Sequence, residues 1–168
     1  MMKTSRLARA GLIAAGYAAL TLCLPFFGFG PIQFRVGEAM CILPFFFPEA
    51  VWGLFGGCLL ANFLGMSFGL TTPWDVVFGS LATLIAAYLT SKIRSEWLVP
   101  LPAVVVNALI VGVMLTFVMV PGMESAPLYY NILTVGAGQV IACYFVGIPL
   151  LKILKRLGFR PNREGTRK

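Results

Sequence analysis

Ionisable and amide side chains interrupt an otherwise apolar stretch between residues 35 and 65. The stretch RVGEAMCILPFFFPEAVWGLFGGCLLANFLG holds Arg35, Glu38, Glu49, Asn62, Pro44 and Pro48. An ionisable group at membrane depth costs about 2.5–3.5 kcal/mol on insertion scales, so it marks a functional site with a partner. Prolines are tolerated there because neighbouring helices satisfy the carbonyls they free. The stretch therefore predicts a polar site inside a membrane-embedded bundle.

The composition of the whole chain supports a membrane environment. The 168 residues are 59% hydrophobic and 11% charged, whereas a soluble domain has about 25% charged residues. The net charge is +7, but the basic residues sit at the ends of apolar segments, as the positive-inside rule requires. We therefore expect one integral membrane domain over residues 1–168, and no nucleic-acid partner.

Apolar runs separated by turn-rich loops predict an all-α fold with six transmembrane helices. Their expected ranges are 7–27, 37–47, 50–66, 74–91, 100–120 and 129–157. The second is short, because eleven residues of helix rise about 16 Å against a bilayer core of about 30 Å. It could instead merge with the third helix, which would give five spans. We expect Pro149 to kink the last helix and the basic tail from about residue 158 to be mobile.

The positions of the basic residues decide between five and six spans. Twelve of the thirteen lysines and arginines lie near the two termini or at residues 92–94. An even number of crossings places all twelve on the cytoplasmic side. Six spans with both termini in the cytoplasm is therefore the prediction.

With this topology, polar and aromatic residues of the later helices collect in the outer half of the bundle. The candidate substrate-binding residues are Arg35, Glu38, Asn62, Trp74, Asp75, Asn107, Tyr130, Asn131 and Gln139. Carboxylates and amides can recognise a planar ligand through hydrogen bonds, and aromatic side chains can stack on its rings. Each amide taken alone could equally bond two helices together.

Two acidic residues lie where a helix begins. Glu49 precedes the third helix, and helix capping is the favoured interpretation there. Asp75 opens the fourth helix, where capping and ligand binding are equally favoured. Trp52, Trp74 and Trp97 lie near segment ends, as interfacial anchors do. The loop from Gly28 to Arg35 is glycine-rich and aromatic, which suits a mobile lid over the pocket.

The sequence offers no set of residues for catalysis. Histidine is absent, and the four cysteines sit singly in apolar runs, where they behave as small hydrophobic residues. No nucleophile motif, phosphate-binding glycine loop or metal spacing occurs. We expect no enzyme activity, metal or cofactor, and an ATP-driven function would need a partner that supplies the ATPase.

Small residues recur every fourth position in the first helix. Ala10, Ala14 and Ala18 form one row, and Gly11, Ala15 and Ala19 form the neighbouring row. Such rows let another helix approach closely. The first row could face a partner protein or pack inside the bundle.

With these features the chain resembles the substrate-binding S components of energy-coupling factor (ECF) transporters. The segments PEAVWGLFGGCLLANFLG and DVVFGSLATL resemble the QueT family in particular. The resemblance covers residues 7–157 and implies a prokaryotic plasma-membrane subunit that binds queuosine precursors, which are 7-deazaguanine bases such as queuine. It also implies a membrane scaffold subunit and two ATPase subunits as partners, with the scaffold docking on Ala10, Ala14 and Ala18.

Two other functions stay open. A self-contained secondary transporter or channel for another small polar solute would need no partner, although no internal repeat supports it. A membrane enzyme would lack catalytic groups, and a bare structural scaffold would leave the outer polar residues without a role.

Overall fold

The computed structural model describes residues 4–23, 34–117 and 126–161, and within them the chain forms helices and no strands. The elements are α1 Thr4–Cys23, η1 Val36–Phe45, α3 Ala50–Ser67, η2 Asp75–Gly79, α4 Ser80–Thr90, η3 Glu96–Leu98, α5 Leu101–Phe117, α6 Leu128–Val140, η4 Ile141–Gly147 and α7 Ile148–Arg156. Since η2 leads into α4, η3 leads into α5, and η4 joins α6 to α7, the described residues form six helical segments. This confirms the predicted six-helix all-α fold.

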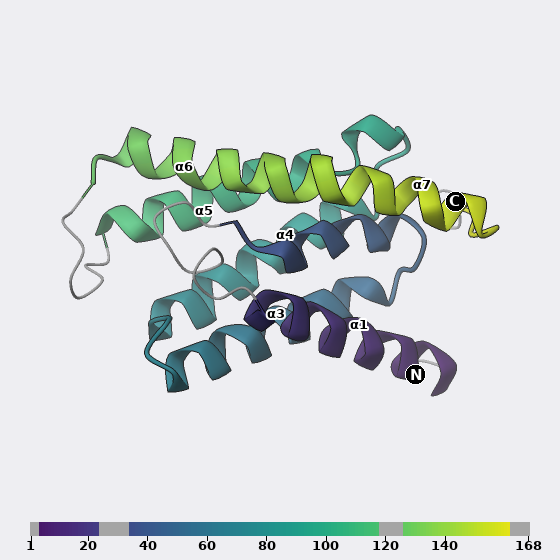
Figure 1. The fold of residues 1–168 in the computed structure, drawn as a ribbon, viewed down its shortest axis with the longest axis horizontal. Coiled ribbons are helices and arrows are strands. Elements are labelled where there is room, and N and C mark those ends of the chain that lie inside the picture. Colours follow the sequence, from purple (N-terminus) through teal and green to yellow (C-terminus); the bar gives the residue numbers. More distant parts are fainter. Residues whose placement is uncertain (1–3, 24–33, 118–125, 162–168) are drawn as a thin grey trace.

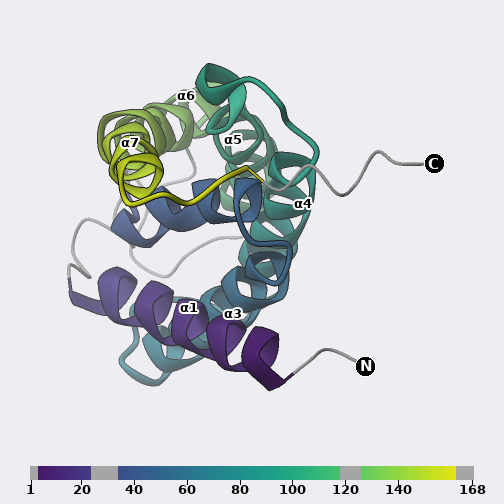
Figure 2. The same ribbon diagram turned by 90° about the vertical axis from the view of Figure 1, so that its right-hand side faces the viewer.

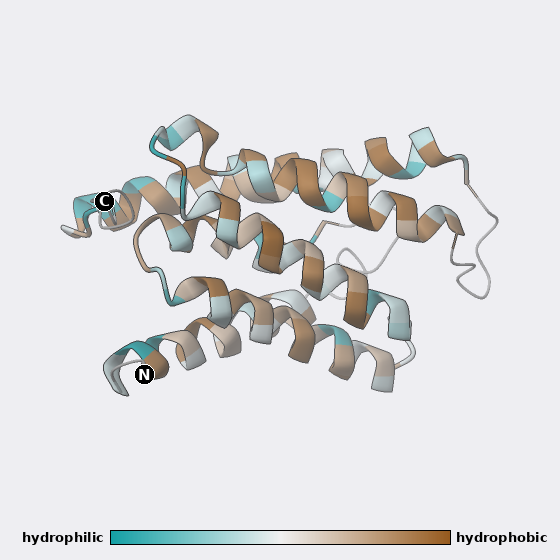
Figure 3. Ribbon diagram, turned by 180° about the vertical axis from the view of Figure 1, so that it is seen from behind, coloured by the Kyte–Doolittle hydropathy of each residue, from teal (hydrophilic) through white to brown (hydrophobic). Residues whose placement is uncertain are grey.

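Three of these segments are long and apolar enough to cross a bilayer. They run over Ala50–Ser67, Glu96–Phe117 and Leu128–Arg156. Even the shortest, with 18 residues, rises about 27 Å. Apolar residues cover the middle of the helices, and hydrophilic ones gather at the end that holds the N- and C-terminal segments (Figure 3). The chain is a multi-pass membrane protein.

The short helix η1 forms the centre of the bundle. Viewed along the bundle, the other helices surround it (Figure 2), and it contacts α1, α3, α4, η4 and α7. Eight of its ten residues are buried. The predicted short second helix is therefore present, but it is a 3₁₀ helix. Pro44 cannot donate a backbone hydrogen bond, and the 3₁₀ form rises about 2.0 Å per residue, which extends its reach.

Helices α1 and α3 pack closely through two glycines of α3. A Cβ atom on Gly53 would lie 2.7 Å from the carbonyl oxygen of Ala10, and one on Gly57 would lie 2.7 Å from that of Ala14. Ala10 and Ala18 are buried in this contact. The prediction that Ala10, Ala14 and Ala18 dock a scaffold subunit is corrected accordingly, because this row packs inside the bundle against α3.

Two of the later segments contain π-helical turns. Asp75–Gly79 opens the fourth segment, and Ile141–Gly147 interrupts the last. The second lies just before Pro149, whose missing N–H leaves a carbonyl of the preceding turn without its helical donor. The kink expected at Pro149 stays a prediction, and the structure places a π-helical turn directly before it. Such turns occur frequently at functional sites.

Helix α1 begins and helix α7 ends at the same end of the bundle (Figure 1). That arrangement fits an even number of crossings; the cytoplasmic orientation stays a prediction. The predicted lid over residues 28–35 lies outside the described residues except for Phe34 and Arg35. The tail beyond residue 161 lies outside them as well.

Candidate functional site

Glu38 lies in the first turn of η1 and is 1% exposed. Its Oε1 accepts from the Tyr17 hydroxyl at 2.5 Å and from the Thr83 hydroxyl at 3.3 Å. Its Oε2 accepts from the Cys41 thiol at 3.0 Å and from the Asn107 amide at 3.3 Å. All four partners are neutral groups able to donate, which suits an ionised carboxylate because it can only accept. We call these five residues the Glu38 cluster.

A second polar group lies beside it, where η1 begins and the fourth segment begins. The Arg35 guanidinium forms an ion pair with Asp75 Oδ1 at 3.6 Å, and both side chains are buried. Asp75 Oδ2 accepts from the backbone N–H and the hydroxyl of Thr72, each at 2.9 Å. The Asn62 side-chain amide donates to the backbone carbonyl of Asp75 at 3.0 Å, and the backbone carbonyl of Asn62 accepts from the Thr71 hydroxyl at 2.7 Å. We call these five residues the Arg35–Asp75 cluster.

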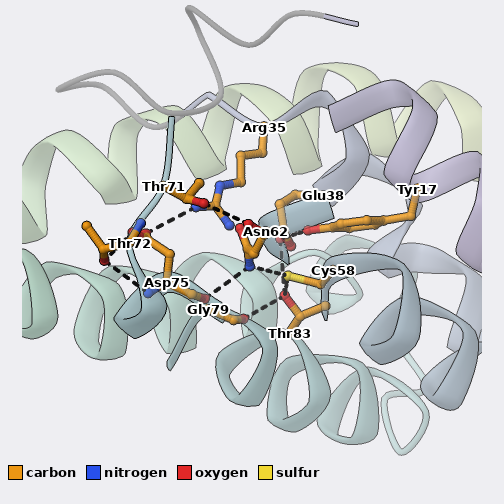
Figure 4. A network of polar contacts seen from close by, with 10 residues as sticks. All are labelled: Tyr17, Arg35, Glu38, Cys58, Asn62, Thr71, Thr72, Asp75, Gly79 and Thr83. Atoms are coloured by element: carbon orange, nitrogen blue, oxygen red, sulfur yellow. Dashed lines mark hydrogen bonds and ion pairs between the residues drawn. The ribbon is translucent and has the colours of Figure 1, made fainter. Parts of the chain in front are cut away.

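The two clusters form one network (Figure 4). The Cys58 sulfur accepts from Asn62 at 3.3 Å and lies 3.3 Å from the Thr83 hydroxyl oxygen, and so joins the two clusters. Gly79 makes room at the junction, because a Cβ atom there would lie 3.1 Å from Asn62 Nδ2 and 3.5 Å from Arg35 Nη1. Asn62 Oδ1 is buried and accepts no hydrogen bond from the part of the chain that the structure describes, which leaves an acceptor for another molecule.

Gln139 reaches the same region from α6. Its Oε1 lies 3.6 Å from the Cys143 thiol, which lies 3.5 Å from the Glu38 carbonyl oxygen. Both side chains are buried. The structure thus brings together six of the nine predicted residues: Arg35, Glu38, Asn62, Asp75, Asn107 and Gln139.

The other three predicted residues lie elsewhere. Trp74 and Tyr130 are 51% and 48% exposed, on the outside of the bundle, and the Trp74 ring stacks on Phe78. Asn131 is buried but bonds the Thr116 hydroxyl at 3.0 Å, so it links α6 to α5.

Several network residues were not predicted. Tyr17, Thr83 and the three buried cysteines look like ordinary residues of apolar helices. Thr72 carried a usable signal, because Thr-x-x-Asp before an apolar run matches a capping box. The Asp75 N–H lies 3.4 Å from the Thr72 hydroxyl, and Asp75 Oδ2 accepts from the Thr72 N–H in return. Asp75 therefore takes part in the cap of its helix and also pairs with Arg35.

Glu49 shows a different arrangement. It holds the N-cap position of α3 without making a side-chain cap hydrogen bond. Its Oε1 instead forms an ion pair with Arg9 of α1 at 3.1 Å. The interpretation of Glu49 as a helix cap is therefore corrected, since its carboxylate joins α1 to α3.

The network offers charged and hydrogen-bonding groups that can bind a polar ligand. Within the described residues, no cluster of His, Cys, Asp and Glu side chains is placed to hold a metal ion. The available groups are a guanidinium, two carboxylates and several amides and hydroxyls. Such groups recognise a polar ligand by charge and hydrogen bonding.

These observations define a helical membrane protein with ionisable groups in its interior, a class in which such groups mark substrate pathways. The family model described as QueT transporter matches residues 7–156. The chain belongs to the QueT transporter family.

One relative is the Queuosine precursor transporter QueT of Lactococcus lactis subsp. cremoris (strain MG1363). It is 34% identical over 85 residues, which are 49% of this chain and 47% of the relative. The match therefore spans about half the length of that protein. No solved structure matches the chain.

Proposed function

We propose that this chain is the substrate-binding S component of an ECF transporter in a prokaryotic plasma membrane, and that it takes up a queuosine precursor. The observation that carries the proposal is the Glu38 cluster. A carboxylate is held at the centre of a membrane bundle by donors from α1, η1, α4 and α5. Family membership and the name of the relative support the choice of a 7-deazaguanine base as substrate.

The chemistry of Glu38 fits the edge of a guanine-like base. A carboxylate can accept from the ring N–H and from the exocyclic amine of such an edge. Two of its present bonds, from Thr83 and Asn107, are 3.3 Å long, longer than typical hydrogen bonds. These two donors are the ones that ligand N–H groups would replace. Asn62 Oδ1 offers a further acceptor.

The energy for transport would come from partner subunits. A membrane scaffold and two ATPases would complete the transporter, as the resemblance to S components implies. If the scaffold docks on α1, the row available to it is Gly11, Ala15 and Ala19, because these residues are exposed and a Cβ atom on Gly11 would meet nothing within 4 Å.

Uptake by reconstituted vesicles tests this proposal. Vesicles with the chain, the scaffold and both ATPases should accumulate labelled 7-aminomethyl-7-deazaguanine when ATP is present, and vesicles with the chain alone should not. Uptake by the chain alone would favour a self-contained transporter instead.

Two substitutions test the docking face. Ala15→Trp should abolish uptake and capture of the scaffold, but leave the substrate affinity of the isolated chain unchanged. Leu109→Trp is the control, because Leu109 is 51% exposed on α5, away from α1. Equal uptake by both variants would contradict docking on this row.

A further inference from the structure

Basic side chains gather at the end of the bundle where α1 begins and α7 ends (Figure 3). The exposed lysines and arginines of the described residues are Arg6, Arg9, Lys92, Arg94, Lys152, Lys155, Arg156 and Arg160. Among those residues Glu49 and Glu96 are the acids of this end, and they already pair with Arg9 and Lys155. The other basic side chains make no ion pair with any described residue.

Two neighbouring rows of side chains at the end of α7 differ in character. Lys152 and Arg156 are exposed and lie four residues apart, so they share one face of the helix. Ile153 and Leu157 follow them by one position each and form the adjacent row, with 51% and 70% of their surface exposed. A helix with a basic row beside an exposed apolar row is suited to the surface of a membrane, where charges meet headgroups and apolar groups meet acyl chains.

The depth of these residues agrees with a position among the headgroups. The span Leu128–Arg156, which ends with α7, has 29 residues and rises about 43 Å, as much as a bilayer including its headgroups. Lys152 Nζ lies 5.7 Å from the centroid of the Trp97 ring in η3, and Trp97 is 67% exposed. Tryptophan is enriched at the level of the headgroups, so Trp97 places its neighbour Lys152 at that level too.

We propose that Lys152 and Arg156 bind the phosphate of an anionic phospholipid, with Trp97 beside its headgroup and with Ile153 and Leu157 against its acyl chains. An ammonium and a guanidinium both donate charge-assisted hydrogen bonds to phosphate. A soluble acidic partner would match the charges but leave the apolar row exposed. The inference is independent of the proposed substrate, because the buried network takes no part in it.

Native mass spectrometry of the full chain in detergent tests the inference. With equal concentrations of phosphatidylglycerol and phosphatidylcholine, the phosphatidylglycerol adduct should be at least about tenfold more abundant, because two basic side chains at the membrane surface favour the anionic lipid. Equal adducts of the two lipids would overturn the inference. Glycerol phosphate at the same concentration should not displace phosphatidylglycerol, since it has no acyl chains, and displacement would indicate a site for free phosphate instead.

Four variants locate the preference. Lys152→Gln and Arg156→Gln should each lower the preference for phosphatidylglycerol about fivefold, and Lys152→Arg should retain it because the charge is kept. Arg6→Gln is the matched control, since it removes one exposed charge from α1 at the same end of the bundle, and it should change the preference less than about twofold. All three side chains are exposed, so the variants are expected to fold. Equal losses in Lys152→Gln and Arg6→Gln would overturn the inference, because the preference would then follow the overall charge of this end.

Discussion

Two buried glutamates on either side of the central helix differ in how their charges are balanced. Glu38 lies in the first turn of η1, and Glu49 follows the last turn; they are 1% and 4% exposed. Glu49 is held by Arg9, whose side chain is 49% exposed. Glu38 is held by four neutral donors. A charge with a permanent counter-ion can serve the structure alone, whereas a charge held by neutral groups remains available to a ligand.

The largest difference between these regions is expected in substrate affinity. Glu38→Gln should weaken binding of 7-aminomethyl-7-deazaguanine by at least about thirtyfold, because removing one partner of a buried charged contact costs about 2–5 kcal/mol. Glu49→Gln should change it less than about threefold, since Glu49 makes its ion pair outside the network. Titration calorimetry on the two purified variants measures both values. Equal losses of affinity in the two variants would show that Glu38 and Glu49 do not differ in their role in substrate binding.

Removing one donor to Glu38 should have the next largest effect. Tyr17→Phe keeps the buried ring but deletes the hydroxyl that bonds Glu38. A hydrogen bond to a charged group contributes about 1.5–3 kcal/mol, so the free energy of unfolding in detergent should fall by about that amount. Tyr88→Phe is the control, because Tyr88 is 56% exposed. An unfolding free energy equal to that of the control would show that the Tyr17 hydroxyl does not support the cluster.

The glycines of α3 allow each region to be disturbed separately. A Cβ atom on Gly57 would lie 2.9 Å from that of Tyr17, beside the Glu38 cluster, and one on Gly53 would lie 3.0 Å from that of Ile13, one turn after Arg9. Gly57→Ala and Gly53→Ala should each destabilise the fold by about 1–3 kcal/mol through overpacking. Only Gly57→Ala should also weaken substrate binding.

Gly56→Ala provides the control for both glycine variants, because a Cβ atom there would meet nothing within 4 Å. Thermal unfolding and ligand titration on all three variants separate the two effects. Equal affinities for Gly57→Ala and Gly53→Ala would contradict the assignment of binding to the Glu38 region.

The smallest effect is expected at the Arg9–Glu49 pair. Arg9→Gln should lower the free energy of unfolding by no more than about 1 kcal/mol, because the half-exposed arginine is screened by solvent. Substrate affinity should not change. Denaturant titration of the single variant and of Arg9→Gln/Glu49→Gln forms the test, and the double variant should recover part of the loss. A drop in affinity for Arg9→Gln would connect this pair to binding.

Much of this architecture is predictable from hydropathy and charge. The six helical segments, the short second helix and the meeting of Arg35, Glu38, Asn62, Asp75 and Asn107 follow from apolar runs and from polar residues inside them. Such residues must find one another, because lipid offers them no partner.

Which side of each helix points into the bundle was harder to predict from the sequence. Trp74 adjoins Asp75 in sequence, but its ring points outside the bundle, because successive helical residues lie about 100° apart around the axis. Likewise, two adjacent rows of small residues on α1 differ only in rotation. The glycines of α3 decide which row packs inside, and that depends on a contact between helices far apart in the sequence.

Native mass spectrometry tests the central claim, that Glu38 holds the substrate, most directly. The wild-type chain, Glu49→Gln and Glu38→Gln would each be incubated with 7-aminomethyl-7-deazaguanine and released from detergent in the spectrometer. The first two should retain one bound base per chain, and Glu38→Gln should retain none. Full occupancy in Glu38→Gln, or an empty wild-type chain, would contradict the claim.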